Sequence, residues 1–92
     1  MPFDALWENI KIHSGQEFTT VTGLSFTYEA HESYIKPSRA NQNIARSDFE
    51  KAYELIPLQG PGQIAKLVRG SAYVYAILTD PRIHDFFPIN EV

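Results

Sequence analysis

The sequence contains no cysteine, and that absence removes several kinds of chemistry at once. A disulfide framework, a thiolate metal site and a thiol nucleophile all require cysteine sulfur. The remaining nitrogen ligands are His13, His31 and His84, which are widely separated in the sequence, whereas zinc needs three or four converging ligands. We therefore expect neither a metal nor a cofactor.

Long apolar runs are also missing from the chain. No stretch approaches the roughly 20 apolar residues that a membrane-spanning helix requires. Residues 1–4 carry no basic segment leading into an apolar stretch, as a secretory signal would. We expect a cytoplasmic protein with no membrane partner, and a protein encoded by a virus or a plasmid would have the same features.

The chain does contain enough apolar side chains for one hydrophobic core. Hydrophobic residues make up 43% of its 92 residues and aromatic residues 13%, which argues against intrinsic disorder. No internal repeat or low-complexity tract divides the chain. Residues 1–92 are therefore expected to form a single compact domain.

A helix and three strands are predicted in the first half. Apolar side chains recur at helical spacing over residues 3–11, and Trp7 lies among them, which favours a place in the core. Residues 18–21 are β-branched and aromatic, and residues 24–30 alternate strictly between apolar and polar side chains. Residues 34–36 form a third, short strand.

These strands are expected to form one antiparallel meander over residues 17–36. Pro37 ends it, because proline has no N–H group for the ladder. Residues 37–46 are polar and are predicted to form a loop. Ser47 and Glu50 have the spacing of a capping box, which predicts a helix that ends by Pro57.

The last third predicts further short helices. Residues 63–69 fit a helix stopped by Gly70 in a left-handed conformation. Residues 72–78 are apolar on every side and fit either a buried helix or a buried strand. We favour a helix because Ser71 can cap its start and residues 79–81 supply a stop. Residues 82–92 are expected to pack against the body.

Together these elements predict an α+β fold. It comprises an N-terminal helix, a three-stranded antiparallel meander, and two or three short helices packed on one face of the sheet.

Charge is unevenly distributed along the chain, whose net charge is −3. Residues 1–35 hold five acidic side chains and one basic one, whereas residues 36–69 hold six basic and three acidic ones, a net charge of +3. A basic region inside an acidic protein is compatible with an anionic partner, although ordinary variation across a solvated surface gives the same asymmetry.

The polar stretch 38–47 concentrates guanidinium, amide and hydroxyl groups directly before a predicted helix amino terminus. Such a terminus binds anions through free N–H groups, and arginine adds a bidentate fork for phosphate, although the same side chains also suit a solvated turn. Phosphate contacts would supply affinity for nucleic acid with little base readout. The predicted nucleic-acid-binding residues are Arg39, Asn41, Asn43, Arg46, Ser47, Lys51, Lys66 and Arg69.

A protein-interaction module or small inhibitor, homodimeric and encoded on a mobile element, is the alternative function. It would bind through the edge of the meander or through Phe86 and Phe87 near the end of the chain. Clustering of the basic side chains on one face favours nucleic acid, and their dispersal beside an apolar patch favours a protein partner.

An enzyme is not expected. The visible acid, base or nucleophile combinations stand in no catalytic motif. They are His13 with Ser14, His84 with Asp85, and the carboxylates Glu29 and Glu32. A small hydrolase or nuclease would need one of these histidines in a cleft beside a carboxylate.

Overall fold

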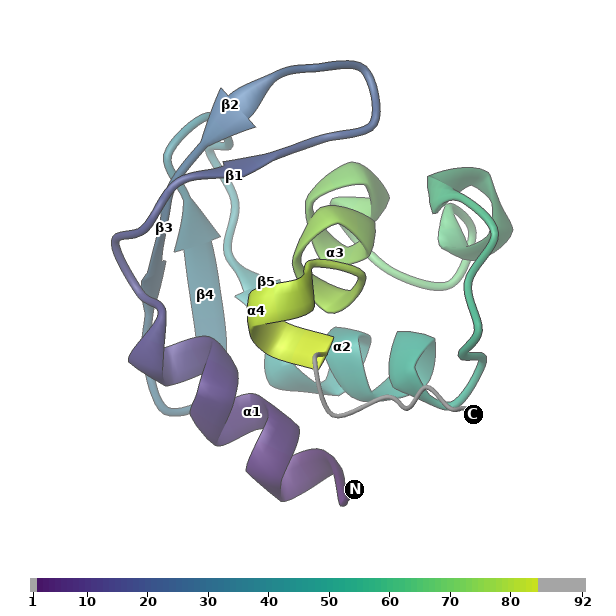
Figure 1. Ribbon diagram of the computed structural model, residues 1–92, viewed down its shortest axis with the longest axis horizontal. Helices are drawn as coiled ribbons and strands as arrows, with labels where there is room; N and C mark the ends of the chain where they lie inside the picture. The colour runs from purple at the N-terminus through teal and green to yellow at the C-terminus, as the bar shows by residue number, and fades with distance from the viewer. Residues whose placement is uncertain (1, 85–92) are drawn as a thin grey trace.

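The computed structural model describes residues 2–84, along which short helices and strands are arranged as in Figure 1. The helices are α1 (Phe3–Ile12), α2 (Arg46–Tyr53), α3 (Ser71–Leu78) and α4 (Pro81–His84), with a 3-10 helix η1 (Pro61–Ile64). The strands are β1 (Phe18–Thr19), β2 (Ser25–Phe26), β3 (Tyr28–Ala30), β4 (Tyr34–Pro37) and β5 (Ile44–Ala45). Helices α2, α3 and α4 lie on one side of β3 and β4. The predicted α+β fold class is confirmed.

The three-stranded antiparallel sheet has the order β3-β4-β5, and its third strand comes from an unexpected segment. Strand β5 lies within residues 37–46, so the prediction that this whole stretch is a loop was wrong. Ile35 of β4 lies opposite Ile44 of β5. Ile44 is only 1% exposed, and burial of its side chain offsets the cost of ordering so short a strand.

The alternating segment 24–30 divides between two sheets. Phe26 of β2 lies opposite Phe18 of β1 in a separate two-stranded ribbon, whereas β3 pairs with β4. Thr27 stands at the junction, where its carbonyl accepts from the Ser38 N–H at 2.8 Å and its own N–H donates to Ser38 Oγ at 3.0 Å. Buried and less buried side chains keep alternating through the junction, so the sequence pattern does not reveal the change of partner.

Helix α1 matches its prediction, and its apolar face is buried. Trp7 is 2% exposed, in the core as predicted. Its indole N–H donates to the Glu32 carbonyl at 3.0 Å, and its ring centroid lies 5.6 Å from that of Phe49. Burial of Trp7 therefore joins α1 to the β3–β4 turn and to α2.

Helix α2 begins at Arg46, so the predicted capping box was wrong. Ala45 is the extended residue before the helix, no side chain caps the first turn, and Ser47 is already helical. The Arg46 N–H donates to the Ser33 carbonyl at 2.8 Å. Strand pairing thus continues up to the first helical residue, which leaves no extended position for Ser47.

The segment before α3 is a 3-10 helix followed by turns, in place of the helix predicted over residues 63–69. Gly70 adopts the predicted left-handed conformation, with φ of 66°. It also precedes α3 directly, so Ser71 is the first helical residue and supplies no cap. Residues 72–78 are helical, as favoured above.

Helix α4 follows α3 after a two-residue break. Asp80 accepts a hydrogen bond from the Arg82 N–H at 2.9 Å, and Pro81 occupies the first helical position. Asp80 therefore caps α4, and Pro81 fits because that position needs no N–H.

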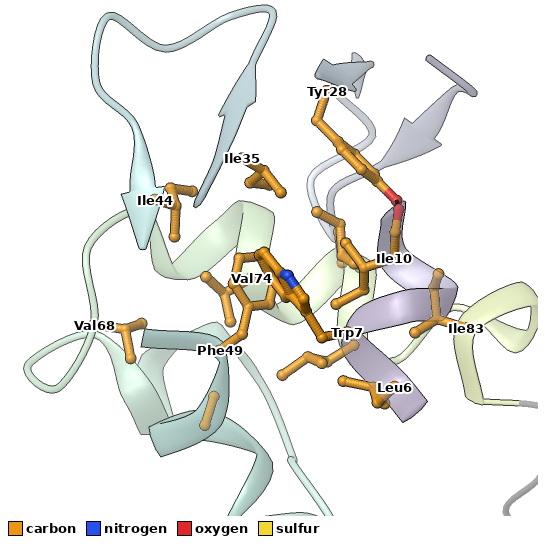
Figure 2. Close-up of a cluster of buried hydrophobic side chains, with 14 of the residues drawn as sticks. Leu6, Trp7, Ile10, Tyr28, Ile35, Ile44, Phe49, Val68, Val74 and Ile83 are labelled. Carbon is orange, nitrogen blue, oxygen red and sulfur yellow. Dashed lines mark hydrogen bonds between the residues drawn. The ribbon is translucent and has the colours of Figure 1, made fainter. Parts of the chain in front are cut away.

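The core lies between the sheet and the helices (Figure 2), and α1, α2, α3, α4 and both sheets contribute to it. The Tyr28 ring points from β3 toward α1, where its hydroxyl donates to the Ile10 carbonyl at 2.6 Å. Burial raises the pKa of this hydroxyl, so Tyr28 stays neutral and bonded. The most fully buried large side chains include Phe18, Phe49, Leu6, Ile10, Ile35, Ile44, Ile64, Ile77, Leu78, Ile83 and Val74.

Candidate nucleic-acid interface

Arg46 is held by the amino terminus of α1. Its guanidinium pairs with the Asp4 carboxylate and lies 5.1 Å from the centroid of the Phe3 ring. Its side chain is 34% exposed. Arg46 therefore connects α2 to α1, and part of its charge is already neutralised within the fold.

Arg39 is oriented by the two-stranded ribbon. Its Nε donates to the Ser25 carbonyl at 2.5 Å. The side chain lines a groove of about 400 Å³ that also contains Glu17 and Thr27. Its Nη groups have no hydrogen-bond partner among residues 2–84, so the guanidinium is both positioned and available.

Arg69, the 38–43 loop and α2 meet at one place. Arg69 Nη1 donates to Gln42 Oε1 at 2.6 Å, and the Arg69 N–H lies 3.5 Å from Asp48 Oδ2. Lys51 Nζ lies 3.8 Å from Asp48 Oδ1. Asp48 therefore brings Lys51 of α2 close to the turn before α3.

Four other predicted residues lie within three positions of Gln42, Asp48 or Arg69 in the sequence, and all four are exposed. Within the described part of the chain their side chains form no hydrogen bond or ion pair. They are Asn41, Asn43, Ser47 and Lys66. We call Asn41, Gln42, Asn43, Ser47, Lys51, Lys66 and Arg69 the Arg69 surface.

The structure thus brings together some of the predicted basic residues and separates others. Arg69 and Lys51 both contact Asp48. Arg46 instead contacts Asp4 of α1, and Arg39 contacts Ser25 of β2. Gln42, absent from the prediction, anchors the loop to Arg69. No local sequence signal indicates this contact, because it joins residues far apart in the chain.

A polar surface that the sequence analysis did not select lies on the outer face of β3 and β4. His31 and Tyr34 stack there with ring centroids 4.5 Å apart and an interplanar angle of 18°. His31 Nε2 lies 3.0 Å from Glu29 Oε1, and Lys36 lies opposite Glu29. The alternation in residues 24–30, continued to His31, was the signal that could have revealed this face.

The candidate catalytic residues are mostly engaged with the backbone. His13 Nδ1 lies 2.9 Å from the Asn9 carbonyl. Ser14 Oγ accepts from the Ala30 N–H at 3.0 Å and lies 3.4 Å from the Tyr28 carbonyl. These contacts fix the loop after α1 beside β3.

The candidate carboxylates have separate partners. Glu29 pairs with His31, whereas Glu32 contacts Lys11 at 2.8 Å. Lys11 also lies 2.9 Å from Glu8, and the hydrogen bonds that Lys11 donates to Glu32 and Glu8 raise the Lys11 pKa. The Lys11 ammonium in turn lowers the pKa of Glu32. Asp85 and the Phe86–Phe87 pair lie outside the described residues.

Arg82 and Asp80 form an ion pair at the start of α4. Arg82 Nε and Asp80 Oδ1 are 2.9 Å apart, and the guanidinium lies 3.9 Å from the centroid of the Phe18 ring. Hydrogen bonding from Arg82 lowers the Asp80 pKa, and the same contact raises the pKa of Arg82. This pair attaches α4 to β1, so its contacts stabilise the fold.

Among the side chains that the structure describes, up to Ile83, no three histidine or acidic groups converge to hold a metal ion. None of the helices in this part of the chain combines the length and the apolar character needed to cross a bilayer. No family model matches the sequence, and no curated protein or solved structure is significantly similar to it.

Proposed function

We propose that this protein is a small, non-catalytic, cytoplasmic domain that binds nucleic acid, and that the Arg69 surface contacts the phosphate backbone. The observation that carries the proposal is the meeting of Arg69, Lys51 and the 38–43 loop around Gln42 and Asp48. Three separate segments contribute cationic and amide side chains to one area. Such a set provides phosphate contacts that are largely independent of sequence.

The exposed amides support this assignment. Asn41 and Asn43 have no intramolecular partner within residues 2–84, so their donors are free for phosphate or sugar oxygens. Lys66 is likewise exposed and unpaired in that range. Asp48 offsets part of the local charge, so the affinity is expected to be modest and salt-sensitive.

The test is fluorescence anisotropy with labelled single- and double-stranded DNA and RNA at roughly 50 and 200 mM salt. Wild-type protein should bind at the lower salt and lose affinity at the higher. Lys51→Gln with Lys66→Gln should weaken binding and make the logarithmic salt slope shallower by about 2. Arg46 is left unchanged, because its replacement would also remove the contact with Asp4.

A matched control separates local contact from net charge. Ile12→Glu with Val21→Glu makes the same change of two charge units at exposed side chains of α1 and of the β1–β2 turn. This control should weaken binding less than the lysine pair does. Equal losses would point to bulk charge, and no binding by the wild-type protein at low salt would reject the proposed function.

The second candidate is a protein-interaction module, favoured by the turn between β1 and β2. Val21 is 61% exposed and Leu24 40% exposed. The turn is held by Thr20, whose Oγ1 accepts from the Leu24 N–H at 3.1 Å. A second copy of the chain would cover these apolar side chains; sedimentation of wild type against Val21→Ser with Leu24→Ser tests for a homodimer.

A further inference from the structure

The outer face of β3 and β4 points away from the helices. Tyr28 and Ile35 are buried on the inner face, so the residues that alternate with them face outward. Strand pairing arranges these outward residues in two adjacent rows. Across the rows the pairs are Thr27 with Ser38, Glu29 with Lys36, and His31 with Tyr34.

An aromatic stack occupies one end of this outer sheet face. The His31 and Tyr34 rings are nearly parallel at 4.5 Å, and the His31 side chain is 41% exposed. Glu29 holds the imidazole through its contact with Nε2. The stack is therefore preorganised, and its solvent-exposed ring can accept another flat ring.

Two grooves lie at the other end and join each other. Each has a volume of about 400 Å³, and Thr27 and Ser38 line both. One groove contains Lys36 and the other Arg39. Within the described residues the Lys36 ammonium has no partner, so each groove holds a cation that can contact an anion.

The stack and the cations are separated along the strands. Lys36 lies two residues from Tyr34 along β4, or about 7 Å at the usual strand rise, and Ser38, which precedes Arg39, lies four residues away, or about 13 Å. A flat aromatic platform beside a cationic groove suits a chain of alternating rings and phosphates. Bases in a duplex are already stacked on each other, so only unpaired bases can use the platform.

We propose that the outer face of β3 and β4 binds single-stranded nucleic acid, with a base stacked on His31 and Tyr34 and phosphates contacted by Lys36 and Arg39. This rests on the proposed function and specifies the form of nucleic acid. The Arg69 surface then supplies further backbone contacts through the 38–43 loop, which begins beside Arg39 and includes Gln42. Glu29 lies on the same outer face, opposite Lys36, and its negative charge repels phosphate. Removal of that charge should therefore raise the affinity.

The probe is a labelled oligothymidylate of about 12 nucleotides, within the size range of single-strand sites, compared with a duplex of the same length. Wild type should prefer the single strand. His31→Ala and Tyr34→Leu should each reduce single-strand affinity about 5- to 100-fold and leave duplex affinity nearly unchanged. Glu29→Gln should increase single-strand affinity at low salt, because it removes a negative charge that repels phosphate. A decrease in affinity would contradict phosphate contact on this face.

Lys36→Gln tests the phosphate contact. It should make the slope of log affinity against log salt concentration shallower by about 1. Trp7 fluorescence reports folding in every variant, because its indole donates to the Glu32 carbonyl next to His31. His31 is exposed, so His31→Ala should still fold and test the stacking contact if Tyr34→Leu does not fold. Binding that survives both ring variants but is lost with Lys51→Gln and Lys66→Gln overturns the platform and keeps the proposed function. No binding by wild type overturns both.

Discussion

At the scale of single residues, charged side chains in this protein divide into those that hold the fold and those that remain available. Arg82 belongs to the first group. It contacts Asp80, donates to the Glu17 carbonyl at 2.7 Å and covers the Phe18 ring. Lys66 and Lys36 belong to the second, since they have no partner within residues 2–84. Sequence alone assigns all of them the same charge.

Arg82→Ala is expected to lower the free energy of unfolding by about 1–3 kcal/mol, because a cation–π contact and charged hydrogen bonds are lost together. Arg82→Lys should recover only part of this, since an ammonium cannot form the same fork. Urea unfolding measures both. Arg69→Ala is the control, with an expected loss below about 1 kcal/mol; equal losses would contradict the structural role of Arg82.

The Asp80 carboxylate predicts a defined acid dependence. Its pKa is lower in the folded state because Arg82 donates to it, so it stabilises the fold above the unfolded value of about 4. This stabilisation is lost as the pH falls through the folded pKa. Wild type should therefore exceed Asp80→Asn in unfolding free energy at pH 6 and lose that advantage below about pH 4. Asparagine also caps helices, so the variant isolates the charge; a difference independent of pH would refute the assignment.

At the scale of elements, close packing explains why Gly70 stands between the 3-10 turn and α3. Its φ is 66°, and a Cβ placed on it would lie 2.7 Å from Ile44 Cδ1. Ile44 is 1% exposed, so a shift of its side chain would disturb the neighbouring core side chains. Gly70 is therefore required both for backbone conformation and for the approach of α3 to β5.

Gly70→Ala is expected to cost about 2–4 kcal/mol, from left-handed strain together with overpacking. Gly23→Ala is the matched control, since Gly23 has φ of 89° with nothing within 4 Å, and should cost about 1 kcal/mol. Ile44→Val removes the Cδ1 atom, so its combination with Gly70→Ala should destabilise less than the sum of the single changes. Thermal or urea unfolding tests this, and simple additivity would show that the clash is absent.

The same scale shows what the sequence could predict. Helical spacing predicted α1, because a local pattern determines it. The apolar run 72–78 fitted a strand equally well, and the Ser71 cap that favoured a helix there is absent, although α3 does end at Leu78. The assignment of strands to sheets failed at Thr27, where burial keeps its period while the hydrogen-bond partner changes. β5 is two residues long and depends on contacts distant in sequence, so no local pattern predicts it. The candidate site followed the same division: residue types were visible, but the contact of Arg69 with Gln42 was not.

At the scale of the whole molecule, the fold separates opposite charges less completely than the sequence suggests. Arg46 of the basic segment 36–69 pairs with Asp4 of the acidic first third, so part of the segment's net charge of +3 is neutralised within the fold. What remains exposed lies on the Arg69 surface and along the outer sheet face. Recognition by this protein therefore depends on a few available cations with neighbouring amides and rings, and its net charge of −3 opposes non-specific binding.

One core joins these surfaces, which predicts cooperative unfolding. Trp7, the sole tryptophan, packs on Phe49 of α2 and bonds to the β3–β4 turn, so its burial requires three elements at once. Urea transitions followed by Trp7 fluorescence and by far-ultraviolet circular dichroism should coincide, as for a single two-state domain. Loss of Trp7 burial at lower urea than loss of helix would show that α1 detaches first, and the chain would then contain more than one cooperative unit.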